Sequence, residues 1–187
     1  MKLWTSISRA AALSLVLCAA FALAPAACTN AGGGAAGAAG AYPGTREGAE
    51  KLLKALMKPG GDLELTKALQ PKSEDYAAVF EGEVAKKEED GYKELWAKIE
   101  PIAAKDGQTE LLLFSATSEE LKSGADAAKE FPGGYAKVGP HLKPGFTWYR
   151  FKFVKPGETS GMAFDGLVHV NGHWALFPKP WRNLGEG

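Results

Sequence analysis

Residues 165–177 read DGLVHVNGHWALF. Asn171 and Gly172 stand between two apolar runs, and this dipeptide is the strongest short-range signal for a β-hairpin, because both turn positions require a positive φ. The turn predicts two antiparallel strands whose pairs run outward from Val170 opposite His173. The rest of the chain must then cover the two faces of this ribbon.

A second hairpin is predicted just before the first. Residues 148–154 and 161–170 alternate between apolar and polar side chains as strands do, and Pro156-Gly157 lies between them. A tight turn at that dipeptide places Phe151 opposite Met162. The two hairpins together predict an antiparallel meander.

Because side chains alternate along a strand and opposed residues share a face, the two turns sort the side chains onto two faces. One set is almost wholly apolar and is predicted to form the core: Tyr149, Phe151, Phe153, Met162, Phe164, Val168, Val170, Ala175 and Phe177. The other set is mixed and contains Trp148, Arg150, Lys152, Ala163, Asp165, Leu167, His169, Trp174 and Leu176. A bulge at Gly166 would shift one strand and exchange its members between the faces.

The mixed face is the candidate binding surface. Apolar patches with charged neighbours usually mark a ligand or partner surface. Its candidate contact residues are Trp148, Arg150, Asp165, His169 and Trp174. A homodimer is one arrangement that would cover this face. In the alternative interpretation, residues 116–145 fold over it, and the face is then part of the core.

The residues before the strands carry the apolar spacing of helices. Thr45, Asp62 and Ser73 are predicted to cap three of them. The apolar pattern of the third helix is interrupted at Gly91, resumes at Tyr92 and ends before Pro101. The charged run KKEED at residues 86–90 is interpreted either as a docking patch or as the solvated face of a helix. We favour the solvated face.

Residues 109–115 are apolar on both parities, which is typical of a strand covered on both faces. Helices followed by strands predict an α+β fold, with N-terminal helices packed on one face of a bent antiparallel sheet of three to four strands.

This element order over residues 45–182 resembles the NTF2-like (cystatin-like α+β) superfamily, whose members enclose a pocket between sheet and helices. The segments 73–80 (SEDYAAVF) and 165–182 are also similar to segments of uncharacterised exported bacterial proteins. The superfamily includes enzymes, binding modules and assembly domains, so the resemblance implies a fold and not a function.

The first 27 residues have the pattern of an export signal. Lys2 and Arg9 supply the positive region, residues 10–24 are apolar, and small residues precede Cys28. The apolar segment is short and lacks the polar stop-transfer flank of a spanning helix.

Residues 23–28, LAPAAC, resemble the lipobox of bacterial lipoproteins, which implies that Cys28 receives diacylglycerol and becomes the mature N-terminus. Pro25 departs from the leucine usual at that position. The alternative is plain secretion after cleavage at Ala26, which would give a secreted or soluble periplasmic protein. We favour lipidation because Cys18 leaves with the signal, so Cys28 has no partner thiol in the mature chain.

Thr29 follows the cysteine, and by the same resemblance this implies an outer-membrane lipoprotein that faces the periplasm. The Ala/Gly-rich residues 28–44 predict a flexible tether, and residues 45–187 a single α+β domain. The chain has 22 basic and 22 acidic residues, and only two basic ones leave with the signal. A near-neutral mature chain without a basic block argues against nucleic-acid binding.

Signals for chemistry are sparse. His169 and His173 have a metal-like spacing, but the turn separates their rings and no cysteine or acidic cluster completes a site, so neither a metal nor a cofactor is indicated. Asp165 and His169 share a predicted face, yet roughly 13 Å of extended strand separates them, which is too far for a hydrogen bond. The sequence contains no GxSxG, P-loop or Rossmann motif.

These signals predict a lipid-anchored envelope protein whose domain binds a small molecule or a protein partner without catalysis. The alternatives are a small pocket enzyme that uses Asp165 or His169 and a purely structural envelope lipoprotein.

Overall fold

A computed structural model of the chain describes residues 41–185. The export signal, Cys28 and most of the predicted tether lie outside the described residues. The hydrophobic core is drawn from side chains between Ala49 and Phe177, and further apolar side chains from Tyr42 to Leu184 pack against it. We therefore expect residues 41–187 to fold without the preceding segment.

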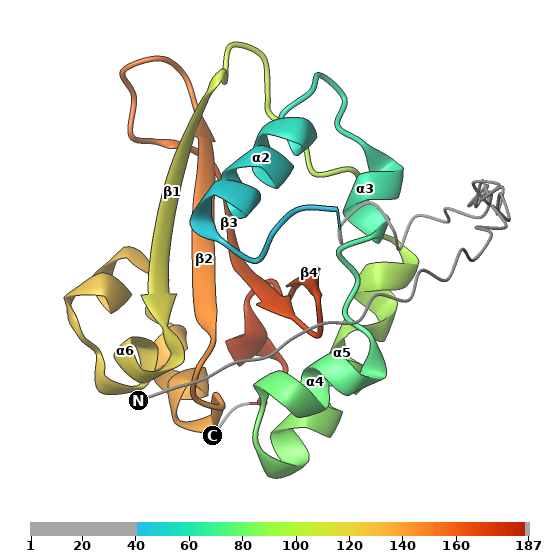
Figure 1. Cartoon of the computed structure of the whole chain (residues 1–187), viewed down its shortest axis with the longest axis vertical. Coiled ribbons are helices and arrows are strands. Elements are labelled where there is room, and N and C mark those ends of the chain that lie inside the picture. Colours follow the sequence, from blue (N-terminus) through green and yellow to red (C-terminus); the bar gives the residue numbers. More distant parts are fainter. Residues whose placement is uncertain (1–40, 186–187) are drawn as a thin grey trace, which may run out of the picture. The chain divides into compact units, whose positions relative to one another are not determined.

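Within residues 41–185, four helices come first, then a strand, a group of short helices, three strands and a final turn of helix (Figure 1). The helical elements are α2 (Arg46–Leu56), α3 (Leu63–Lys67), α4 (Ser73–Val79), α5 (Gly82–Ala97), α6 (Ser118–Ser123), η1 (Asp126–Glu130), α7 (Tyr135–Val138), η2 (Gly139–His141) and η3 (Pro180–Arg182). The strands are β1 (Glu110–Thr117), β2 (Thr147–Val154), β3 (Gly161–Val170) and β4 (His173–Leu176). The general α+β class is confirmed.

Two of the predicted helix caps are confirmed. The side chain of Thr45 accepts a hydrogen bond from Gly48 N at 3.2 Å, and that of Asp62 accepts one from Leu65 N at 2.9 Å. The third cap was misplaced by one residue. Helix α4 begins at Ser73, but its N-cap is Lys72, whose N–H donates to the Asp75 carboxylate at 2.6 Å.

Helix α5 runs unbroken through Gly91, so the predicted interruption there is wrong. The glycine has a packing reason. A Cβ at this position would stand 2.4 Å from Cγ of Asn183, which belongs to the C-terminal segment. The missing side chain lets that segment lie against the helix.

The sheet is a meander in the order β1-β2-β3-β4. The register predicted from Asn171-Gly172 is confirmed, with Val170 opposite His173. The β2–β3 register differs from the prediction by two residues, because residues 155–160 form a wider loop than a tight Pro-Gly turn. A tight Pro-Gly turn would splay the two strands. With the wider loop, Phe151 lies opposite Phe164 instead of Met162.

Gly166 forms a β-bulge. Arg150 pairs with Asp165 and Tyr149 pairs with Leu167, so Gly166 has no partner on β2. Its φ is +89°, and a Cβ would stand 1.9 Å from the carbonyl oxygen of Phe177. Only glycine fits this conformation and this close approach.

The bulge exchanges the predicted faces of β4 and of the second half of β3, because one extra residue reverses the alternation beyond it. The first face carries Tyr149, Phe151, Phe153, Met162, Phe164, Leu167, His169, Trp174 and Leu176. The opposite face carries Trp148, Arg150, Lys152, Ala163, Asp165, Val168, Val170, Ala175 and Phe177.

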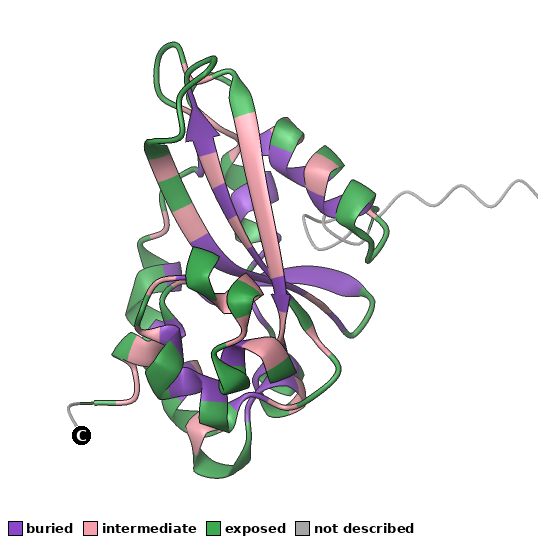
Figure 2. Cartoon of the chain, turned by 90° about the vertical axis from the view of Figure 1, so that its left-hand side faces the viewer, coloured by how far each residue is buried: buried purple, intermediate pink, exposed green. Residues whose placement is uncertain are grey.

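Both faces of the sheet carry large apolar side chains, and helices cover both. The prediction that the helices pack on one face is therefore wrong. The segment that leads into α2 packs on the first face, where Tyr42 O accepts a bond from the Trp174 indole. Phe80, after α4, and Tyr135, in α7, pack edge-on against Trp148 on the other face. Residues 116–145 fold over Trp148, Arg150 and Asp165, so that interpretation is confirmed for this part of the predicted mixed face. It is wrong for His169 and Trp174, which lie on the other face. Figure 2 shows the buried part of the sheet between these layers.

Candidate functional site

The five predicted contact residues do not form one surface. Trp148, Arg150 and Asp165 lie on one face of the sheet, and His169 and Trp174 lie on the other. The bulge at Gly166 is the physical reason, because it reverses the alternation between Asp165 and His169. The predicted mixed surface is therefore wrong, and the Asp165–His169 pair does not converge.

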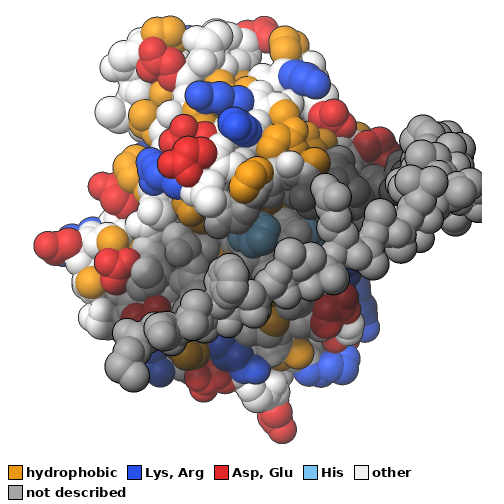
Figure 3. All heavy atoms as spheres, in the orientation of Figure 1, with side chains coloured by type: hydrophobic (Ala, Val, Ile, Leu, Met, Phe, Trp, Pro, Cys, Tyr) orange, Lys and Arg blue, Asp and Glu red, His pale blue; other side chains and the backbone are white. Residues whose placement is uncertain are grey.

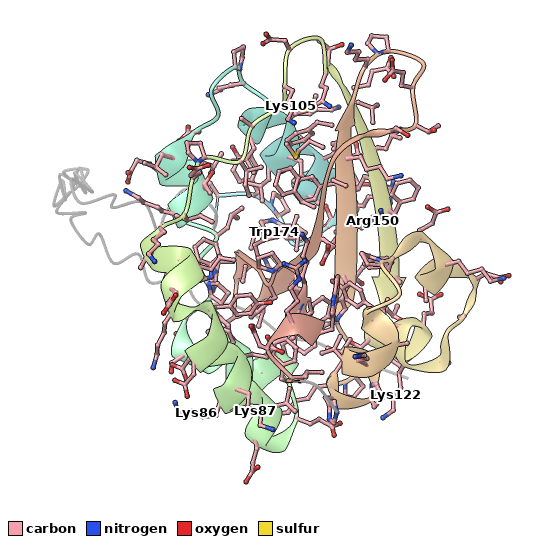
Figure 4. The ribbon with its side chains drawn as sticks, turned by 180° about the vertical axis from the view of Figure 1, so that it is seen from behind. Lys86, Lys87, Lys105, Lys122, Arg150 and Trp174 are labelled. Atoms are coloured by element: carbon pink, nitrogen blue, oxygen red, sulfur yellow. The ribbon has the colours of Figure 1, made fainter. Side chains whose placement is uncertain are left out.

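Trp148 and Arg150 serve packing on their face. The Trp148 side chain is fully buried, and its indole N–H donates to the Ser118 hydroxyl at 3.0 Å. The Arg150 guanidinium donates to the carbonyl of Glu130. Figure 4 shows Arg150 on the side of β2 toward α6, away from Trp174.

His169 and Trp174 hold the chain that leads into α2. Trp174 is fully buried, and its indole N–H donates to Tyr42 O at 3.1 Å. The rings of His169 and Trp174 meet edge-on, with centroids 5.1 Å apart. Burial lowers the pKa of His169, and nearby His173 lowers it further, so its imidazole is neutral at neutral pH. The predicted tether thus ends before Tyr42, which already belongs to the domain.

An open apolar groove lies between the C-terminal end of α5, the segment after it and the β3 strand. Its volume is about 770 Å³, within the range of small-molecule sites. The apolar walls come mainly from Leu95, Ile99, Ile102, Met162, Phe164 and Leu176. Leu95 is 38 % exposed, one of only two large apolar side chains among the described residues that are so open.

The groove continues along β3 into a smaller cavity of about 350 Å³, since Leu95 and Met162 line both. The continuation is also mostly apolar, but its lining includes the charged side chains of Asp165, Lys179 and Arg182. We call the two together the α5–β3 groove.

Asp165 is the buried acid of this groove. Its Oδ1 accepts bonds from the Tyr135 hydroxyl at 3.2 Å and from Lys179 N at 3.0 Å. Burial raises its pKa, and these two donors oppose that rise without cancelling it. The carboxyl therefore ties the segment after β4 to β3 and forms part of the groove wall.

A second buried carboxyl lies in the charged run of α5. Glu88 is fully buried, its Oε2 accepts a bond from Asn183 Nδ2 at 2.9 Å, and its Oε1 has no partner among residues 41–185. Burial raises the pKa of Glu88 to about 7, although the hydrogen bond from Asn183 acts in the opposite direction.

Elsewhere in this run the solvated-face interpretation is confirmed, because Lys86, Lys87 and Asp90 are exposed and Asp90 pairs with Lys86 and Lys93 within the helix. Figure 4 shows Lys86 and Lys87 on the outer side of α5. The helical spacing of Glu88, Tyr92 and Trp96 was the signal that could have identified Glu88 as buried.

Sequence reasoning also missed a buried acid–imidazole contact. Asp75 accepts bonds from Asn171 Nδ2 at 2.7 Å and approaches His173 Nε2 at 3.0 Å. These residues pin the β3–β4 turn to the first turn of α4. Because 98 positions separate Asp75 from His173, no local pattern in the sequence announces the pair.

Across residues 41–185, no group of three or more His, Cys, Asp or Glu side chains is arranged to hold a metal ion. None of the helices described there combines the length and apolar character needed to cross a membrane. On the face drawn in Figure 3, acidic and basic side chains are interspersed among apolar ones.

Comparisons of this chain with protein-family models, with curated proteins and with solved structures find no match.

Proposed function

We propose that this chain is an exported, lipid-anchored protein of the cell envelope whose domain binds an apolar ligand or partner in the α5–β3 groove and catalyses no reaction. The observation that supports binding is the groove itself, which leaves Leu95 open to solvent beside Met162 and Phe164. Exposed apolar surface of this kind is unfavourable in water and is kept where a ligand or partner covers it.

Helices that precede a four-stranded meander support an NTF2-like domain, and helices on both faces depart from that resemblance. The non-enzymatic proposal draws on the distribution of titratable groups. Asp165 is bound by two donors, and His169 stands on the opposite face beside Trp174. A general acid and base must reach one reacting atom, and these two side chains do not.

The test of binding uses the anionic apolar dye anilinonaphthalene sulfonate (ANS). Leu95→Gln removes the open apolar side chain from the groove, and Leu63→Gln is its matched control, because Leu63 is 37 % exposed and lies outside the groove. We expect the folded domain to bind ANS with a Kd weakened roughly tenfold by Leu95→Gln and unchanged by Leu63→Gln. Equal binding by all three proteins would remove the proposed site.

The anchor is tested separately, by growth of an expressing bacterium with radioactive palmitate. The lipobox resemblance predicts a labelled protein that fractionates with membranes, and Cys28→Ala should lose both the label and the membrane association. An unlabelled, soluble wild-type protein would establish plain secretion instead.

A further inference from the structure

The α5–β3 groove exposes the edge of a strand. Its smaller half, beside Asp165, touches Met162, Ala163, Phe164 and Asp165, four successive residues of β3. Successive side chains of a strand point to opposite faces, so a cavity can meet all four only along the backbone edge. The floor of the groove is therefore the edge of β3 itself.

That edge has no pairing partner among the described residues. Strand β4 pairs with β3 only as far as Leu167 opposite Leu176, and one further bond joins Phe177 N to Gly166 O at 2.8 Å. The chain then leaves the sheet at Pro178, while the other edge of residues 161–165 is occupied by β2. Alternate residues of a strand direct N–H and C=O groups to each edge, so this half of β3 presents unpaired donors and acceptors.

The charges at the two ends of the groove differ. Around the apolar half, acidic and basic side chains balance, as Glu94 and Glu100 stand beside Lys98 and Lys105. The half beside Asp165 carries Lys179 and Arg182, both exposed. The only carboxyl that lines this half is that of Asp165, which is buried and already accepts two hydrogen bonds. The two exposed cations therefore outnumber it, and this end attracts a negative group.

We propose that the occupant of the α5–β3 groove is an extended peptide segment of a partner protein, which pairs with β3 in line with β4. Its apolar side chains lie against Leu95 and Met162, and an acidic side chain meets Arg182. The inference rests on the proposed binding function and names the class of partner. An extended chain satisfies both requirements of the groove, since its backbone pairs with the free edge and its alternate side chains enter the apolar half.

The available edge fixes the length of the segment. Residues 161–165 span about 17 Å at the rise of a β-strand, which suits a segment of about five residues. An anionic lipid would satisfy the apolar walls and Arg182, but it would leave the edge of β3 unpaired. This difference separates the two classes of ligand in experiment.

The test begins with a displayed library of random peptides of about ten residues, selected on the folded domain. We expect selected peptides to carry apolar residues at alternate positions together with an acidic residue. Fluorescence polarisation of a selected peptide should show a Kd weakened roughly tenfold by Leu95→Gln and unchanged by Leu63→Gln. Arg182→Gln should weaken it roughly fivefold at low salt and less at high salt.

Backbone pairing is tested on the peptide. N-methylation at alternate positions removes the N–H groups that would pair with β3, and we expect one of the two alternating sets to weaken binding more than tenfold and the other to have little effect. Equal tolerance of both sets would overturn strand addition, as would binding that ignores Leu95→Gln.

Two controls distinguish a peptide from other occupants of the groove: displacement of ANS by dodecanoate, and sedimentation of the domain without any ligand. If no peptide is selected while dodecanoate displaces ANS from the wild-type groove, the peptide inference fails and the proposed binding function stands. If neither ANS nor dodecanoate nor any peptide binds, both fail. A dimer in sedimentation that Leu95→Gln dissociates would identify a second copy as the occupant and overturn the peptide partner.

Discussion

The buried carboxyl of Glu88 makes a quantitative prediction about stability and pH. Its pKa is about 7 in the folded protein and 4.5 when the side chain is solvated. Between these values the unfolded chain has lost its proton while the folded chain still holds it. Unfolding then releases a proton, so the free energy of unfolding falls as pH rises.

The size of the effect follows from the two pKa values. Each unit of difference is worth about 1.4 kcal/mol, so Glu88 destabilises the fold by about 3 kcal/mol above pH 7 and not at all below pH 4.5. Glu88→Gln keeps the shape and an oxygen acceptor for Asn183, and it cannot ionise. The variant should equal the wild type near pH 4 and exceed it by about 3 kcal/mol near pH 8.

Urea unfolding of both proteins at several pH values measures this difference directly. The difference in free energy of unfolding between the two proteins does not contain the contribution of His169 and other shared groups. Glu94→Gln, an exposed substitution on the same helix, controls for the loss of a charge on α5. If the free energies of unfolding of the wild type and Glu88→Gln differ by the same amount at every pH, Glu88 is not a buried carboxyl that binds a proton in the folded state.

Two further substitutions test the fold that positions the groove. Gly166→Ala should lower the free energy of unfolding in urea by about 3 kcal/mol or more, because it combines a positive φ with a Cβ against the Phe177 carbonyl. Gly157→Ala is the control: it has a φ of +75° but open space around it, and it should cost about 1 kcal/mol. Equal losses in the two variants would contradict the bulge. Asp75→Ala removes the buried acceptor shared by Asn171 Nδ2, Lys72 N and the His173 ring, and it should lower the free energy of unfolding by about 3 kcal/mol. A decrease of less than about 1 kcal/mol would show that this contact does not pin the turn.

Local features of the fold were predictable from the sequence. The Asn171-Gly172 turn determined the register of β3 and β4, because its geometry admits only one pairing. Thr45 and Asp62 were recognisable as caps, because a cap needs only a side-chain oxygen and a backbone N–H three residues on.

The candidate site was not predictable in the same way. Whether Gly166 bulges depends on the carbonyl of Phe177, which approaches it only after the β3–β4 hairpin has formed. That single residue reversed the predicted faces and dispersed the predicted site. The α5–β3 groove brings Leu95 to Met162 across 67 positions, and no periodic pattern encodes such a meeting.

Binding in the α5–β3 groove can be located residue by residue through NMR titration of the isotope-labelled domain with ANS. We expect the backbone amides of Leu95, Met162 and Phe164 to shift most, in one saturable transition that Leu95→Gln weakens. Shifts centred instead on α2 and Trp174, or no shifts at concentrations at which ANS binding is saturated, would contradict binding in the α5–β3 groove.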